Sequence, residues 1–131
     1  MMRSMLAVAA LLFCSPASAG QKPTATEVFH LRSECSKLGK QLLWEVGLKL
    51  EHAFSSYFAK YDEDTNRCFV LIKDDYNLGK QITLRLYDGQ GAGMMATWTS
   101  DAGGIFMIGD HSVPQPEAYE YIQHVMKDAA P

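Results

Sequence analysis

The chain has 131 residues, of which 47% are hydrophobic and 21% are charged. This composition is typical of a globular protein and excludes a disordered or collagen-like chain. Twelve Lys and Arg residues stand against 15 Asp and Glu residues, which gives a formal charge of -3. Proteins that bind nucleic acids need an excess of basic side chains, so the composition argues against such a function.

The first 20 residues have the three parts of a secretory signal peptide. Arg3 provides a basic start, an apolar run extends from Met5 to Phe13, and residues 17–19 read Ala-Ser-Ala, as a cleavage site requires. The apolar run is far shorter than the roughly 20 residues of a membrane-spanning helix. We therefore predict cleavage after Ala19 and a mature chain, residues 20–131, that forms a single domain. It would carry a charge of -4, have no membrane anchor and be periplasmic or secreted.

Three cysteines become two when the signal peptide is removed, because Cys14 lies within it. A lipoprotein acylated at Cys14 is the alternative, but the bulky Phe13 stands where such proteins have a small residue. Cys35 and Cys68 belong to no Cys-x-x-Cys pattern, and two cysteines in an oxidising compartment usually pair. We predict a Cys35–Cys68 disulfide, with a reactive or metal-bound thiol as the alternative.

The first element of the mature chain is predicted to be an amphipathic helix. Thr24 and Glu27 have the spacing of a capping box, and Gly47 is a plausible end. Apolar residues then recur every three or four positions, which places them on one face of a helix. They are Val28, Leu31, Cys35, Leu38, Leu42 and Val46.

A β-hairpin is predicted next. The aromatic-rich segment 54–61 reads as a strand, although residues 48–58 could also prolong the helix. Residues 62–66 form a polar turn, and residues 67–72 are a β-branched and aromatic strand. Cys68, Val70 and Ile72 share one face of this strand, which should meet the first helix.

The rest of the chain predicts two or three further strands and a helix. After a loop at 74–79, segment 81–87 alternates, with Ile82, Leu84 and Leu86 inward and Thr83, Arg85 and Tyr87 outward. A turn through Gly93 leads to strand 94–99, with Met94, Ala96 and Trp98 on one face. Segment 105–108 is a short last strand. Pro114 and Pro116 introduce a helix with Ala118, Tyr121, Ile122 and Val125 on one side.

These elements predict an α+β protein. It has an N-terminal helix, an antiparallel meander of four or five strands, a C-terminal helix and one helix-to-sheet disulfide.

Three motifs resemble functional sites but lack required residues. Asp62-x-Asp64-x-Asn66 opens like an EF-hand, yet the required glycine and glutamate are replaced by Arg67 and Lys73. Glycines 89, 91 and 93 lack the further glycine of a dinucleotide fingerprint and the lysine of a P-loop. Both segments predict hairpin turns. Asp110-His111-Ser112 are consecutive and cannot converge as a hydrolase triad does, so we predict a turn in which Ser112 helps to cap the last helix. We predict no metal site, no cofactor and no catalytic residue.

Arg85 and Tyr87 are the residues that we predict for a binding role. They lie on the polar face of their strand, beside Thr97 or Thr99 of the next strand, and a sheet face that helices leave uncovered is a reasonable contact surface. His30, His52 and His124 lack the spacing of a zinc site and are predicted to be ordinary surface or boundary residues.

The segment Tyr61-Asp62-x-x-x-Asn66-x-Cys68-Phe69, followed by Leu86-Tyr87-Asp88, resembles a group of small exported bacterial proteins. That group also has a cysteine in its first helix, here Cys35. Asp62 stands where the group usually has asparagine, and Lys60 where histidine often precedes the tyrosine. The resemblance implies an exported, disulfide-bearing protein and supplies no catalytic residue.

Two functions from different classes follow. The first is a non-enzymatic binding protein of the cell envelope, whose partner is another envelope or secreted protein; inhibition of a basic secreted enzyme would suit the acidic charge. The alternative is a small hydrolase or metal-assisted enzyme that uses His111 with Asp88, Asp101 or Asp110. A purely structural envelope protein is a third possibility.

Overall fold

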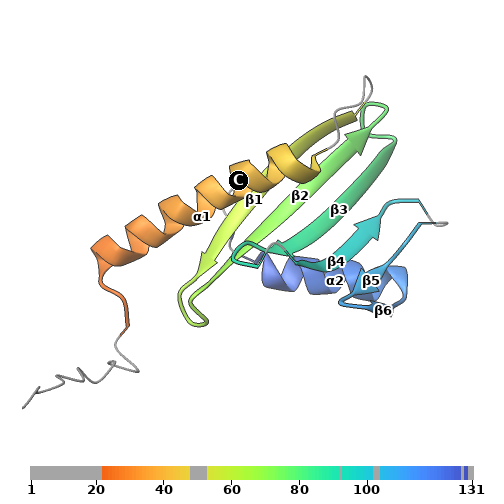
Figure 1. Ribbon diagram of the computed structural model, residues 1–131. Helices are drawn as coiled ribbons and strands as arrows, with labels where there is room; N and C mark the ends of the chain where they lie inside the picture. Colours follow the sequence, from red (N-terminus) through yellow and green to blue (C-terminus); the bar gives the residue numbers. More distant parts are fainter. Residues whose placement is uncertain (1–21, 48–52, 92, 102–103, 128, 130–131) are drawn as a thin grey trace, which may run out of the picture.

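Two helices flank one antiparallel sheet of six strands (Figure 1). The computed structural model describes residues 22–47, 53–91, 93–101, 104–127 and 129, so the predicted signal peptide lies outside the described residues. Each strand pairs with the next in the chain, as in a meander. The predicted α+β class and the helix-sheet-helix order are confirmed. The elements are α1 (Ala25–Val46), β1 (Ala53–Asp62), β2 (Arg67–Tyr76), β3 (Gln81–Asp88), β4 (Met94–Thr99), β5 (Met107–Ile108), β6 (His111–Ser112) and α2 (Gln115–Val125).

Several boundaries differ from those predicted. The sheet has six strands rather than four or five, because His111–Ser112 pairs with β5 instead of forming a turn. β2 continues through Tyr76, so most of the predicted loop 74–79 is strand. β1 begins at Ala53, which rules out helix at residues 53–58. Ser112 does not cap α2, whose N-cap residue is Pro114 and has no side-chain hydrogen bond.

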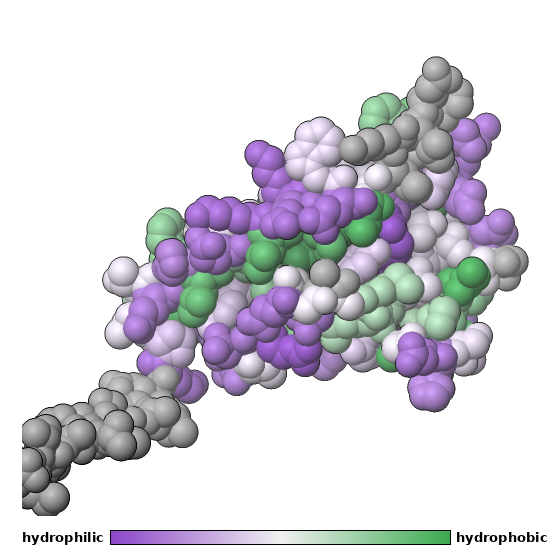
Figure 2. Space-filling model, in the orientation of Figure 1, coloured by the Kyte–Doolittle hydropathy of each residue, from purple (hydrophilic) through white to green (hydrophobic). Residues whose placement is uncertain are grey.

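α1 begins with the predicted capping box, in which Glu27 N–H donates to Thr24 Oγ1 and Thr24 N–H donates to the Glu27 carboxylate. Hydrophilic residues cover much of its outer surface, and apolar atoms lie where it meets the sheet (Figure 2). Gly39 is part of the buried stripe. A β-carbon at Gly39 would lie 2.6 Å from the Tyr57 ring, so glycine allows α1 to approach β1 closely.

The predicted disulfide between Cys35 and Cys68 is confirmed and joins α1 to β2. Both cysteines are buried in a cluster with Leu42, Val70, Ile72 and Tyr87. The predicted inward face of β2 therefore meets α1. Tyr87 is a correction, because it was predicted to point outward and is only 6% exposed. The sheet has a buried layer on each side, so alternation does not separate buried from exposed residues here.

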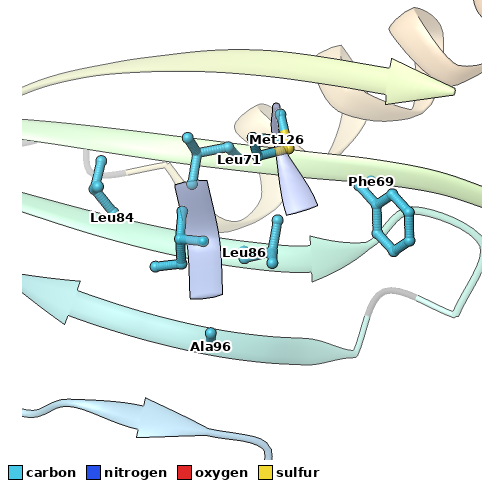
Figure 3. Close-up of a cluster of buried hydrophobic side chains, with 7 residues drawn as sticks. Phe69, Leu71, Leu84, Leu86, Ala96 and Met126 are labelled. Atoms are coloured by element: carbon cyan, nitrogen blue, oxygen red, sulfur yellow. The ribbon is translucent and has the colours of Figure 1, made fainter. Parts of the chain in front are cut away.

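α2 packs on the opposite face of the sheet. There it completes a second cluster with side chains of β2, β3 and β4, several of which are labelled in Figure 3. The rings of Trp98 and Tyr119 pack in a tilted arrangement with their centroids 4.9 Å apart. The predicted apolar sides of β3 and α2 are confirmed. This cluster consists of Phe69, Leu71, Leu84, Leu86, Ala96, Ile122 and Met126.

Each helix receives a basic side chain from the sheet near its C-terminal end. Arg85 Nη2 donates to the Val46 carbonyl of α1 at 2.8 Å, and Lys60 Nζ donates to the Val125 carbonyl of α2 at 2.8 Å. These contacts satisfy terminal carbonyls and place positive charge at the negative end of each helix dipole. Neither of the described helices combines the length and apolar character needed to cross a membrane.

Candidate functional site

The strand register defines a surface beside α1. Residues aligned across an antiparallel sheet point to the same side, and one such row runs Ile72, Arg85, Thr97, Met107 and Ser112 from β2 to β6. α1 packs on β1 and β2, whereas α2 packs on the other side against β4 and β5. Within the described ranges, no helix packs on the α1 side of β4 and β5. We define the helix-free face as the side chains of Met94, Thr97 and Met107, with Arg85 and Tyr87 at its inner edge, where α1 covers the sheet.

A β-bulge brings Met94 to this face. Leu86 pairs with Ala96, but the next residue, Tyr87, pairs with Met94, so the register shifts by one residue. The prediction that Met94 shares a face with Ala96 and Trp98 is therefore wrong. Met94 is 48% exposed. Figure 2 shows hydrophobic residues, in pale green, at the surface in the region of β4 and β5.

Arg85 is at the centre of a polar network between this face and α1. Its Nε donates to Asp74 Oδ2 at 2.9 Å, and its Nη1 contacts the Tyr87 hydroxyl at 3.2 Å. Ser55 donates to the other Asp74 oxygen at 2.5 Å. The Asp74 side chain is 1% exposed and that of Arg85 is 19% exposed. The pairing satisfies a buried carboxylate that would otherwise be costly to desolvate.

This network changes the interpretation of the predicted binding residues. Arg85 and Tyr87 form the inner edge of the helix-free face, and each guanidinium nitrogen of Arg85 already has a partner in the protein. They support the surface, while Met94 and Met107 extend it outward. Asp74 was missed because it was assigned to a loop. Continuing the alternation of Cys68, Val70 and Ile72 by one more step would have placed Asp74 on the α1 side.

The motif at residues 61–69 and 86–88, which carries the resemblance to exported proteins, consists of residues with structural roles. The Tyr61 hydroxyl donates to Asn66 Oδ1 across the β1–β2 turn, and Asn66 has the positive φ of 53° that this turn requires. Cys68 forms the disulfide, and Asp88 accepts from Arg67 at the end of β3. These contacts account for the motif without a ligand.

The pKa of the Asp88 carboxyl is lower than usual. Partial burial acts to raise the pKa of its carboxyl, but the Arg67 hydrogen bond and charge and the backbone N–H groups of Gln90 and Gly91 together hold the pKa below its usual value of 3.8. These contacts favour the ionised form. Asp88 is thus the anionic half of a structural ion pair.

An open groove of about 950 Å³ lies between the first turns of α1 and the β1–β2 turn. Arg32 and Glu63 form an ion pair of 2.8 Å near it, and a second groove of about 640 Å³ shares part of its wall. The lining of the larger groove contains Lys22 together with acidic residues of α1 and of the β1–β2 turn.

The predicted turn at residues 62–66 is confirmed, and the Asp62 carboxylate accepts a hydrogen bond from Thr65. Among the described residues, no three His, Cys, Asp or Glu side chains are placed to hold a metal ion.

His111 lies far from one of its predicted partners. Leu86, Ala96, Ile108 and His111 are aligned on four neighbouring strands, so three strand spacings, about 14 Å, separate Leu86 from His111. Asp88 lies two residues further along β3, beyond hydrogen-bonding reach. Among the described residues, no hydrogen bond or ion pair joins His111 to a carboxylate.

The remaining motif residues are placed as follows. The glycine-rich segment after Asp88 connects β3 to β4, as predicted, with Asp88 N–H donating to the Gly93 carbonyl. His30 and His124 are exposed, in agreement with the prediction, and His52 lies outside the described residues.

No known protein family matches this chain, and no curated protein or solved structure does either. The resemblance to small exported bacterial proteins stays a prediction. The function is therefore argued from the surface alone.

Proposed function

We propose that this protein is an exported, non-enzymatic binding protein of the cell envelope that contacts another protein through the helix-free face. The observation that carries the proposal is the exposure of Met94 on a sheet face where no described helix packs. Methionine side chains are flexible and polarizable, and they are enriched in protein interfaces.

The supporting structure beneath this face is rigid. Tyr87 is buried, and Arg85 is fixed by Asp74, by the Tyr87 hydroxyl and by the Val46 carbonyl. Thr97 is 9% exposed between Arg85 and Met107. A pre-organised surface loses little conformational entropy on binding, which favours affinity.

Export is supported by the disulfide and by the signal-peptide pattern. A Cys35–Cys68 bond would persist in an oxidising compartment and would be reduced in most cytosols. The enzyme alternative that uses His111 has no comparable support, because no carboxylate partner of His111 lies among the described residues.

The test is affinity capture from envelope extract with the mature chain as bait. The variant Met94→Asn/Met107→Asn removes apolar area from the helix-free face without changing charge. Leu78→Asn is the matched control, because Leu78 is 87% exposed in the β2–β3 turn and its φ of 57° suits asparagine.

We expect one protein to be captured by the wild type and by Leu78→Asn, with recovery about tenfold lower for the double variant, as the loss of an interface anchor would cause. Circular dichroism checks that both variants fold. Equal recovery by all three baits, or no protein enriched over a bait-free resin, would overturn the proposal.

A further inference from the structure

The two edges of the sheet differ in length and in protection. β6, at one edge, has two residues, and β1, at the other, has ten. Edge strands are usually shortened, bulged or guarded by proline or charged side chains, because their open main-chain groups pair readily with other strands. β1 has no register shift against β2, contains no proline and carries no charge at residues 54–59. Its one lysine, Lys60, donates to the Val125 carbonyl of α2 and does not guard the edge.

The strand register identifies the main-chain groups that face the open edge. Gly89 N–H donates to the Cys68 carbonyl at 2.8 Å, so the main-chain groups of Cys68 point to β3, away from its β1 partner Tyr61. Aligned residues of an antiparallel pair either exchange hydrogen bonds or both point away from each other, and the two kinds alternate. Tyr61 therefore points away from β2, and so do Ala59 and Tyr57, two and four residues before it. Among the described residues, no backbone group bonds to the N–H of Tyr57 or Ala59.

The helices pack on the faces of the sheet and leave this edge open. The Cys35–Cys68 disulfide ties α1 to β2, and the Val46 carbonyl at its last turn accepts from Arg85 of β3, so α1 is anchored inward of β1. β1 forms one margin of the sheet (Figure 1). None of the side chains at residues 54–62 is fully buried, whereas most of those in β2 are. A further strand beside β1 would complete their burial.

We infer that two copies of the protein pair through β1, in antiparallel orientation about a twofold axis, and so form one continuous sheet. Tyr57 and Ala59 of each copy then exchange hydrogen bonds with the outward-facing groups of the other copy. A second copy suits this edge because it supplies a strand of the same length, and residues 54–59 bring no like charges together. β6 is too short to offer a comparable edge.

The pairing is compatible with both helices and with the helix-free face. Three strand spacings, about 14 Å, would separate β2 from its counterpart in the second copy. Helices pack with their axes about 8–10 Å apart, so there is room for both copies of α1. β1 lies at the far end of the sheet from β5 and β6, so the dimer would present two helix-free faces. The inference goes beyond the proposed function and does not depend on it.

The test combines sedimentation equilibrium with amide hydrogen exchange on the mature chain. Both are measured at about 0.5 mM chain, where a homodimer with a micromolar dissociation constant is almost fully formed. We expect twice the mass of one chain. We also expect slow exchange at Tyr57 and Ala59, whose amides face water in a monomer. Phe58 and Lys60 bond to β2 in either state, so their amides should exchange slowly in both.

A matched pair of variants locates the contact. Ser56→Lys introduces an exposed lysine in the uncharged part of β1, close to the twofold axis, and Ser112→Lys makes the same change on the exposed edge strand β6. Like charges that face each other across paired strands repel. We expect Ser56→Lys to raise the dissociation constant at least tenfold and to accelerate exchange at Tyr57 and Ala59 alone. Ser112→Lys should behave as the wild type.

A mass of one chain, or fast exchange at Tyr57 and Ala59 in the wild type, would overturn the inference. A dimer that Ser112→Lys disrupts as strongly as Ser56→Lys would also overturn it, because the contact would then lie elsewhere. Circular dichroism checks that both variants fold. If Ser56→Lys does not fold, the mass and the exchange pattern of the wild type still decide the inference.

Discussion

The two helices are held against the sheet by different interactions. α1 is tied to β2 by the Cys35–Cys68 disulfide and reaches the Arg85 network through its last turn. α2 is held by apolar packing around Ile122 and by the Trp98–Tyr119 contact, with hydrogen bonds from Lys60 and Gln115 at its ends. Both helices have a basic side chain from the sheet at the C-terminal end. The difference between them therefore lies in the disulfide and in the buried Arg85–Asp74 pair, which are both on the α1 side.

This comparison shows how the helix-free face is supported. The α1 side stabilises β1, β2 and β3 covalently and electrostatically, and Arg85 and Tyr87 belong to this part. The α2 side depends on the packing of apolar side chains against α2, and it includes β4 and β5. Loss of the disulfide should therefore loosen α1 first, and loss of core volume should loosen α2 first.

The largest effect is expected for Cys35→Ala/Cys68→Ala. The disulfide closes a loop of 34 residues, and releasing it should lower the free energy of unfolding by about 3–4 kcal/mol, because the unfolded chain gains entropy. Chemical denaturation measures the loss. Amide exchange should accelerate in α1 more than in α2. Unchanged stability, or faster exchange confined to α2, would contradict this account of how α1 is held.

Ile122→Ala tests the other side. Ile122 is fully buried between α2 and the sheet, so truncation should cost about 3 kcal/mol through lost burial and a cavity. Exchange should accelerate in α2 and β4 while α1 stays protected. Phe29→Ala is the control, since Phe29 is 76% exposed and its loss should change stability by less than about 0.5 kcal/mol. A similar cost for both variants would show that α2 does not depend on this packing.

Much of the fold could be predicted from local patterns. The capping box and apolar stripe of α1 and the alternation of β3 depend on residues close to one another in the sequence. The Cys35–Cys68 pairing follows from the even number of cysteines in the predicted mature chain. The strand at His111–Ser112 could not be predicted, because two polar residues form it only by pairing with β5. The β-bulge that turns Met94 to the other face has no marker in the segment Met94–Thr99.

The candidate site was predicted less completely. Arg85 and Tyr87 were assigned to the correct side of β3, beside Thr97, but were expected to be open to solvent. Whether a polar strand face is covered depends on where α1 lies across the sheet, and α1 packs mainly on β1 and β2. The sequence predicts a loop at Asp74, since Asp and Asn favour turns, but the buried ion pair with Arg85 outweighs that preference.

The smallest expected effect concerns the Arg67–Asp88 pair, which joins the start of β2 to the end of β3. Because the pKa of Asp88 is lower in the folded protein than its usual value of 3.8, its ionised form contributes stability above that pH. That contribution is lost as the pH falls through the lowered pKa. In Arg67→Met the pKa should rise toward the usual value. The stability lost at neutral pH should be no more than about 1 kcal/mol, since Arg67 is largely exposed.

An NMR titration of the Asp88 carboxyl measures this shift directly. Lys80→Met is the matched control, because it removes the same charge from the β2–β3 turn, at the opposite end of these strands, and should leave the pKa of Asp88 unchanged. If both variants raised the pKa of Asp88 equally, the Arg67 contact would have no specific role. The field of the whole chain would then set the titration of Asp88.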